Sequence, residues 1–337
     1  MINVGIIGYG YWGPNLVRNF FSNNKCNVLK VADKNPKRLE VLKKFYPSIE
    51  AVSDAYDIIN DNNIDAVVIA TPVSSHYELA KASLLNNKHV LVEKPFTLNL
   101  KEAEELVSIS EKNKRVLMVD HVFVYNPAVI RMKELIKNGD IGDLRYYDAV
   151  RINLGLFQQD VNVLWDLAVH DISILLYIYE KKPLSLSATG ISHLKNSLEN
   201  IAYITLFYDN DFIAHISVSW VSPVKIRRII VGGSSKMLIY DDIEPTEKIK
   251  IYDAGYYIKD IVKEEERYRI LIDYRLGDIY VPKIQQVEAL SNVVEDFLDS
   301  IIKNKLPISN GYFGLEVMNI LEKANLSIKE RGKEFKL

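Results

Sequence analysis

The chain has 337 residues, of which 48% are hydrophobic and 26% are charged, and its formal net charge is −2. A chain of this length exceeds the usual size of one hydrophobic core, so two domains are expected. The nearly balanced charge gives no electrostatic basis for binding nucleic acid or an anionic membrane, and neither is expected as a partner.

The cysteine content and the absence of targeting signals predict a cytoplasmic protein. The single cysteine, Cys26, cannot form an intramolecular disulfide, which is typical of a reducing compartment. The N-terminal residues MINVGIIGYG lack the charged region and cleavage site of a signal peptide. No apolar run reaches the roughly 18–20 residues that cross a bilayer, so we expect no membrane anchor.

Strand and helix patterns alternate through the first third of the chain. Strands are predicted at residues 2–8, 27–33, 65–71, 89–95 and 116–122, and helices at 14–23, 36–45, 76–86 and 100–112. The segment DAVVIAT at 65–71 is rich in β-branched residues, as a strand buried on both faces should be. The alternation predicts a parallel sheet of right-handed β-α-β units, and hence a Rossmann-type dinucleotide-binding domain over residues 1–123.

The pattern changes after Pro127. A helix at 128–138 is predicted, followed by strands at 144–154, 184–191, 201–208, 212–220, 227–232 and 236–240. Short turns rich in Asp, Asn and Gly join these strands, which favours a large, mostly antiparallel open sheet. Helices at 284–304 and 312–331 close the chain. We therefore predict an α/β protein whose second domain covers residues 124–337, and whose two last helices can pack back onto the first domain.

A glycine-rich loop joins the first predicted strand to the first predicted helix. The helix N-terminus offers amide donors and a partial positive charge, and the glycines allow the backbone to approach a pyrophosphate. Asp33 lies twenty residues after the last glycine, where the ribose-binding acid of a dinucleotide fold belongs. A structural turn without a ligand is the alternative. The predicted cofactor-binding loop consists of Gly8, Tyr9, Gly10, Tyr11, Trp12 and Gly13.

The identity of the second-strand acid predicts the cofactor. Asp33 is expected to accept hydrogen bonds from the adenosine ribose and to repel a 2′-phosphate, so NAD is preferred. The neighbouring Lys34 offers a cation and leaves NADP open. In open α/β sheets ligands bind at the carboxyl ends of the strands. Further cofactor contacts are therefore expected from Thr71, Pro72, His76, Glu93 and Lys94.

Two elements carry candidate proton chemistry. Lys94, at a strand end, can hydrogen-bond a substrate hydroxyl and stabilise negative charge on oxygen, although a solvated surface cation is the alternative. Asp166 and His170 are four residues apart and share one face of a predicted helix. Such a pair can be structural, can transfer protons, or can form half of a metal site. Hydride transfer from a carbinol leaves a proton to remove, and a histidine suits that task.

The metal interpretation has little support. The chain has six histidines, one cysteine and no HExxH motif, so we expect no metal ion. With the glycine loop and Lys94 upstream, the Asp166–His170 pair is interpreted as a proton-transfer couple, and the structural pair remains the alternative.

Four segments together resemble the Gfo/Idh/MocA family of sugar-type oxidoreductases. They are GIIGYGYWGPN, ATPVSSHYELA, VLVEKPF and the Asp-x-x-x-His element, in this order, and the resemblance spans essentially the whole chain. It implies a Rossmann domain followed by an α/β domain with a large open sheet, and homodimers or homotetramers packed through such sheets. It also implies that Lys94 contacts substrate and nicotinamide, that His170 is the general acid or base, and that Asp166 binds substrate beside it.

Further substrate contacts are predicted around these residues. Tyr125 and Asn126 resemble a family segment that borders the site, and Arg151, Asn153 and Trp165 are the other candidates in the second domain. The resulting hypothesis is an NAD(H)-dependent dehydrogenase acting on a secondary hydroxyl of a sugar. A nucleotide-linked sugar oxidised at C3, as used in polysaccharide biosynthesis, is favoured by analogy. The alternatives are a family glycosidase that uses NAD without net redox change, and a non-catalytic NAD- or sugar-sensing protein.

Overall fold

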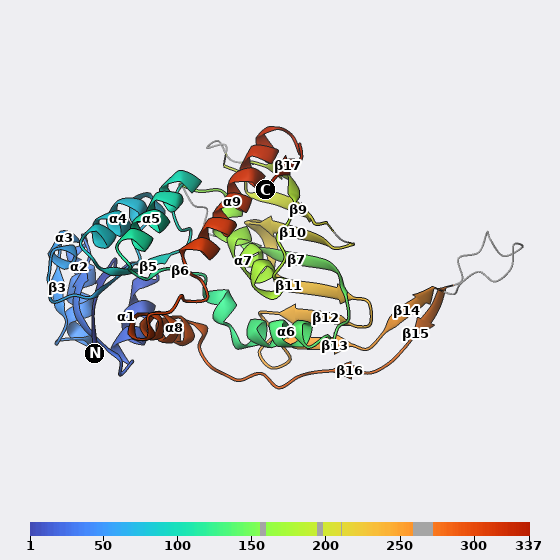
Figure 1. The fold of residues 1–337 in the computed structure, drawn as a ribbon, viewed down its shortest axis with the longest axis horizontal. Coiled ribbons are helices and arrows are strands. Elements are labelled where there is room, and N and C mark those ends of the chain that lie inside the picture. Colours follow the sequence, from blue (N-terminus) through green and yellow to red (C-terminus); the bar gives the residue numbers. More distant parts are fainter. Residues whose placement is uncertain (156–159, 194–197, 210, 259–271) are drawn as a thin grey trace, which may run out of the picture. The chain divides into compact units, whose positions relative to one another are not determined.

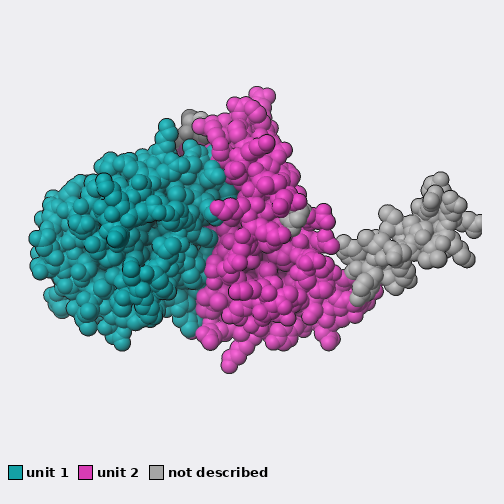
Figure 2. Space-filling view, in the orientation of Figure 1, with its two compact units in different colours: residues 1–126, 287–322 teal, residues 127–286, 323–337 magenta. Residues whose placement is uncertain are grey.

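The chain folds into two compact units in a computed structural model that describes residues 1–155, 160–193, 198–209, 211–258 and 272–337. The first unit comprises Met1–Asn126 and Val287–Glu322, and the second comprises Pro127–Gln286 and Lys323–Leu337 (Figure 2). Each unit is described by itself below. Within these residues, the structure contains no helix with the length and hydropathy of a membrane span.

A parallel six-stranded sheet forms the centre of the first unit, with the order β3-β2-β1-β4-β5-β6 (Figure 1). Its strands are β1 (Ile2–Ile7), β2 (Cys26–Ala32), β3 (Glu50–Val52), β4 (Ala66–Ile69), β5 (His89–Glu93) and β6 (Leu117–Asp120). β4 is buried over its whole length because helices cover both faces of the sheet. The strand order reverses between β1 and β4, which is where a doubly wound sheet binds its ligand.

Helices connect these strands in the alternation that the sequence predicts. They are α1 (Gly13–Phe21), α2 (Pro36–Phe45), α3 (Tyr56–Ile59), η1 (Val73–Ser75), α4 (His76–Leu85), α5 (Leu100–Lys112) and η2 (Val122–Tyr125). Asn35 and Asn99 cap α2 and α5, because their side chains accept hydrogen bonds from Lys37 N and Glu102 N. The predicted Rossmann fold is therefore confirmed.

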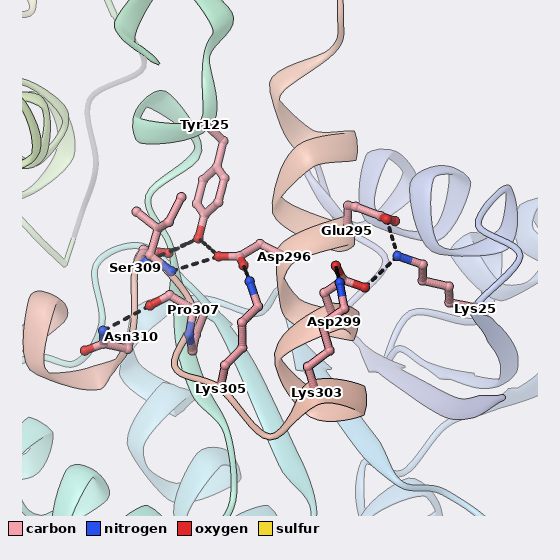
Figure 3. A network of polar contacts seen from close by, with 11 residues as sticks. Lys25, Tyr125, Glu295, Asp296, Asp299, Lys303, Lys305, Pro307, Ser309 and Asn310 are labelled. Carbon is pink, nitrogen blue, oxygen red and sulfur yellow. Dashed lines mark hydrogen bonds and ion pairs between the residues drawn. The ribbon is translucent and has the colours of Figure 1, made fainter. Parts of the chain in front are cut away.

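The first unit also contains α8 (Ala289–Lys303) from the far end of the chain. Its apolar face is buried, and Phe297 packs edge-on against Phe20 of α1 with ring centroids 6.3 Å apart. Figure 3 shows the polar contacts beside it: the Tyr125 hydroxyl donates to Asp296 Oδ2 at 2.9 Å, and Lys25 contacts Glu295 and Asp299. These contacts fix α8 against the Rossmann sheet. The last helix, α9 (Gly311–Lys329), is divided between the two units after Glu322.

A nine-stranded sheet dominates the second unit, in the order β16-β13-β12-β11-β7-β10-β9-β8-β17. The strands are β7 (Leu144–Leu154), β8 (Ser185–Ile191), β9 (Ile201–Phe207), β10 (Ile213–Ser219), β11 (Val221–Gly233), β12 (Met237–Asp241), β13 (Ile249–Tyr252), β16 (Ile279–Tyr280) and β17 (Phe335–Lys336). Of the pairings described, only that of β7 with β10 is parallel. The predicted mostly antiparallel sheet is therefore confirmed.

Helices α6 (Pro127–Lys137) and α7 (Val169–Ile178) accompany this sheet, and a π-helical turn, η3 (Leu164–Ala168), precedes α7. A two-stranded sheet of β14 (Gly255–Ile258) and β15 (Ile272–Arg275) is separate from the nine-stranded one. Along β7, Tyr147, Ala149 and Arg151 are buried and their neighbours are partly exposed. One face of the sheet thus packs into the core and the other does not.

Candidate functional site

The glycine loop between β1 and α1 has the shape of a pyrophosphate cradle. Gly8 adopts φ +102°, and a Cβ there would lie 2.4 Å from the Ala70 carbonyl oxygen. A Cβ on Gly13 would lie 2.3 Å from the Gly8 carbonyl oxygen. At Gly10 the nearest atom is Arg38 Nη1, 3.6 Å away, so this side of the backbone is open. The residues therefore fit a dinucleotide, whose pyrophosphate would lie against exposed backbone at the start of α1.

Asp33 is held rigidly where β2 ends. Its Oδ2 accepts a hydrogen bond from Tyr9 N at 2.7 Å, and its Oδ1 accepts one from Asn35 N at 2.7 Å. Arg38 Nη1 lies 3.3 Å from the same Oδ2. Asp33 is buried, whereas Lys34 is exposed and Arg38 is half-exposed. The carboxylate is thus oriented toward the glycine loop, as ribose recognition requires.

Arg38 is a residue that the sequence analysis missed. Its position in the first turn of α2, five residues after Asp33, was the available signal. A guanidinium beside Asp33, the acid predicted to bind ribose, offers the cation that Lys34 was expected to provide for a 2′-phosphate.

The His76 ring contacts two loop carbonyl groups, and its predicted contact with the cofactor stays a prediction. The ring is buried, and its Nδ1 and Nε2 lie 2.8 Å from the carbonyl oxygens of Pro95 and Thr71. His76 therefore joins the loops that follow β4 and β5. Thr71 remains partly exposed beside it and accepts a hydrogen bond from Ser75, and Pro72 is exposed.

Two acids meet at the carboxyl ends of β5 and β6, next to Lys94. Glu93 and Asp120 are partners in the parallel register. Burial, and then the charge of Asp120, raise the pKa of Glu93 well above its usual range, while burial raises the pKa of Asp120. Trp12 of the glycine loop places its Nε1 3.4 Å from Asp120 Oδ2. Lys94 is half-buried and follows Glu93, whose register partner Asp120 contacts the glycine loop.

Tyr125 packs beside α8, and its predicted substrate contact stays a prediction. Its ring is buried, and its hydroxyl donates to Asp296 Oδ2 and accepts a hydrogen bond from Ser309 N at 3.1 Å (Figure 3). Burial and the charge of Asp296 raise the pKa of Tyr125 well above its usual range. Asn126, at the end of the first unit's N-terminal segment, is half-buried.

In the second unit, Asp166 lies in the π-helical turn η3 and His170 lies in the first turn of α7. Both side chains are partly exposed although their neighbours are buried. Asp166 Oδ2 accepts a hydrogen bond from Trp220 Nε1 at 3.0 Å, and Trp220 is itself buried between β10 and β11. Single π-helical turns occur frequently at functional sites. The turn presents a carboxylate and an imidazole on an otherwise apolar element.

A buried ion pair anchors this element to the sheet. Arg151 of β7 donates from Nε and Nη2 to the two carboxylate oxygens of Asp171, at 2.8 and 2.9 Å. Tyr147, also on β7, donates from its hydroxyl to the Asp171 carbonyl oxygen at 2.9 Å. Because Asp171 adjoins His170, these bonds fix the start of α7. Arg151 was predicted to contact substrate, and in the structure its guanidinium is engaged with Asp171 in the core; the substrate contact stays a prediction.

The remaining predicted substrate residues differ in accessibility. Trp165 is buried and presents little surface, and its predicted substrate contact stays a prediction. Asn153 is half-buried near the end of β7, and its Oδ1 receives no hydrogen bond from any described residue. No group of acidic, histidine or cysteine side chains suited to a metal ion occurs in the described ranges.

Comparison with known proteins places these features among oxidoreductases. A family model described as "Oxidoreductase family, NAD-binding Rossmann fold" matches residues 2–121, and a "GFO/IDH/MocA C-terminal domain" model matches residues 129–239. A UDP-N-acetylglucosamine 3-dehydrogenase of Acidithiobacillus ferrooxidans is 26% identical over 328 residues, covering 94% of each chain. A myo-inositol 2-dehydrogenase of Thermotoga maritima is 26% identical over 272 residues, covering 75% of this chain and 79% of that protein.

A solved structure supports the same fold. An oxidoreductase from Agrobacterium radiobacter, crystallised with NAD+, L-tartaric acid and magnesium, superposes with a TM-score of 0.81 at 17% identity. The match covers 99% of this chain and 98% of that one. The predicted NAD cofactor is confirmed by the first family model.

Proposed function

Because the chain belongs to the GFO/IDH/MocA family of NAD-binding oxidoreductases, we propose that it moves a hydride between nicotinamide and a secondary hydroxyl or ketone of a sugar. The observation that carries this proposal is the half-buried Asp166–His170 pair on an anchored helical turn. A nucleotide-linked sugar oxidised at C3 is the favoured substrate, because the relative from Acidithiobacillus ferrooxidans acts, by its name, on such a compound.

The chain's own residues divide the work of the oxidation. When bound, the dinucleotide accepts the hydride from the carbinol carbon. His170 takes the proton from the hydroxyl oxygen, and in the reverse direction it returns that proton to the ketone. Lys94 donates a hydrogen bond to a substrate oxygen, and its ammonium stabilises the negative charge that develops there. Asp166, fixed by the Trp220 indole, accepts a hydrogen bond from a neighbouring sugar hydroxyl.

Substrate turnover with purified protein tests the proposal. UDP-N-acetylglucosamine, other UDP-sugars and myo-inositol are each incubated with NAD+, and NADH is followed by its absorbance. We expect one NADH per sugar oxidised. Lys94→Ala and His170→Ala should each lose roughly 10²–10⁴-fold in turnover, because each removes a group that acts on the reacting oxygen. Both variants should still bind NAD. Lys101→Ala, on the exposed start of α5, is the matched control and should keep its activity.

The same assay separates the alternatives. Glycoside cleavage without net NADH would favour the NAD-dependent glycosidase, and ligand binding without any turnover would favour the sensing protein. Activity near wild type in Lys94→Ala or His170→Ala would refute the role assigned to that residue.

We also propose that the second unit associates with further copies of the chain, as a homodimer or homotetramer, through the open face of its sheet. Tyr146 and Ile213 are cross-strand partners on this face, and they are 38% and 44% exposed. Tyr203, on the neighbouring strand, is 46% exposed. Partly exposed aromatic and branched side chains in one patch are typical of an association surface. Light scattering after gel filtration should report more than one chain, and Tyr203→Glu should lower that mass.

A further inference from the structure

Two acids meet at the edge of the Rossmann sheet: Asp120 is buried, and one carboxyl oxygen of Glu93, Oε1, is buried as well. Glu93 and Asp120 end neighbouring parallel strands in register, and their side chains hydrogen-bond each other. Two ionised carboxylates cannot form such a bond, because both are acceptors only. One of the two must therefore donate, which is the arrangement of a carboxyl–carboxylate pair. Among the described residues, no other donor reaches Glu93 Oε1 or Asp120 Oδ1.

The charged and titratable groups around the pair are few. Lys94 attracts both carboxyls, and its backbone N–H donates to Glu93 Oε2 at 3.2 Å. Trp12 contributes a neutral N–H to Asp120. His121 follows Asp120 and is buried against Phe313; burial, and then the charge of Lys94, lower the pKa of His121 to about 3, so its ring is neutral at ordinary pH. With one proton, the pair carries a single negative charge, which the Lys94 ammonium balances.

The position of the pair in the sheet determines which part of the cofactor it faces. Asp33 ends β2 and the glycine loop follows β1, so the adenosine half and the pyrophosphate belong to that side of the sheet. The nicotinamide half then belongs to the ends of β4, β5 and β6. Oxidised nicotinamide carries a positive charge and reduced nicotinamide does not. A buried pair in a region of low dielectric constant responds strongly to that difference.

We propose that Glu93 and Asp120 form a proton-exchanging pair that distinguishes the two redox states of the cofactor: it releases its shared proton when NAD+ binds and keeps it when NADH binds. The positively charged ring of NAD+ favours the pair with both carboxyls ionised. The neutral ring of NADH leaves the charge balance between the pair and Lys94 unchanged. Asp120 is thus a positioning residue that links the Trp12 loop to Glu93, and it senses charge. The inference depends on NAD binding and requires no sugar substrate.

The expected consequence is a pH-dependent preference between the two cofactor forms. Release of a proton on NAD+ binding makes NAD+ affinity increase with pH relative to NADH affinity, by at most about tenfold per pH unit for one linked proton. The increase is confined to the pH window between the values at which the NADH-bound and NAD+-bound pairs lose that proton.

Calorimetric titration tests the proposal with NAD+ and NADH as the probes. Binding is measured from about pH 5 to about pH 9, in buffers of different ionisation enthalpy, so that released protons are counted directly. For the wild type we expect NAD+ to release up to one proton more than NADH. Asp120→Asn and Glu93→Gln should each bind both cofactors without this difference, because an amide keeps the hydrogen bonds and removes the exchangeable proton. Glu105→Gln, an acid of α5 paired with Lys81, is the control and should behave as wild type.

Two results would overturn the inference. One is equal proton release for NAD+ and NADH in the wild-type protein. The other is a difference in proton release between NAD+ and NADH that persists in both Asp120→Asn and Glu93→Gln. If one of these two variants does not fold, the other still tests the inference. Trp12→Phe, which removes only the N–H donor, should retain the proton difference while weakening both cofactors alike. These measurements need no sugar turnover, so they can be made even if the protein oxidises no sugar. Failure of the proposed function can therefore be told apart from failure of this inference.

Discussion

Arg151→Met should strongly destabilise the second unit, because it leaves Asp171 charged and buried without its partner. The two side chains are each 2% exposed, and both guanidinium–carboxylate bonds are shorter than 3 Å. Breaking a buried pair from one side costs about 3–5 kcal/mol. Whole domains are stable by only about 5–15 kcal/mol, so the loss is a large share of the total. Replacing both residues, as Arg151→Met with Asp171→Leu, should recover most of the loss, because no uncompensated charge remains.

The assay is urea unfolding followed by hydrogen exchange of peptides from α7, which isolates the second unit's response. Arg145→Met is the matched control on the same strand. Arg145 is 47% exposed, and its Nη1 lies 3.4 Å from Asp211, so its loss should cost at most about 1 kcal/mol. NAD binding should be unchanged in all variants. The reasoning is wrong if Arg151→Met unfolds like Arg145→Met, or if the double variant is no more stable than the single one.

Three further outcomes follow from the geometry of the two units. Gly13→Ala should destabilise the first unit, since its Cβ would collide with backbone. Gly10→Ala should fold normally and weaken NAD binding about tenfold or more, because its Cβ would occupy the pyrophosphate space. Equal changes in NAD affinity and in unfolding free energy for the two variants would contradict this. Asp33→Ala should narrow the gap between NAD and NADP affinity, and Arg38→Ala added to it should remove the gain in NADP binding. Trp220→Phe should lower turnover while leaving NAD affinity unchanged, because it removes a hydrogen bond to a carboxylate worth about 1.5–3 kcal/mol.

Local patterns were sufficient to predict the fold and the glycine loop between the first strand and the first helix. A strand buried on both faces, such as Ala66–Ile69, has a continuous apolar sequence that reveals its place in a parallel sheet. The need for glycine at positions 8 and 13 likewise arises from close backbone contacts, at Gly8 with Ala70 and at Gly13 with Gly8. The acid at the end of the second strand could be identified by counting residues from the loop.

Long-range partners explain why the contacts of Arg151 and Tyr125 could not be predicted from the sequence. Arg151 lies on a strand whose two faces alternate, and the sequence does not say which face a helix covers. Its partner, Asp171, is twenty residues away, and the partner of Tyr125, Asp296, is 171 residues away. A long polar side chain near a site looks the same in sequence whether it binds substrate or neutralises a buried charge. Only the register and packing decide between these roles.

The same limit explains why the pairing of Glu93 with Asp120, and the buried partners of the turn at Asp166, were not predicted. Glu93 and Asp120 meet through strand register, which one sequence does not encode locally. In the second unit, Trp220 holds the turn at Asp166, and Arg151 holds it at the residue after His170. A site fixed at both ends by buried groups keeps its geometry whatever surrounds it. If the proposed proton transfer is correct, differences in substrate among relatives should arise at partly exposed positions such as Asn153 rather than in the anchored turn.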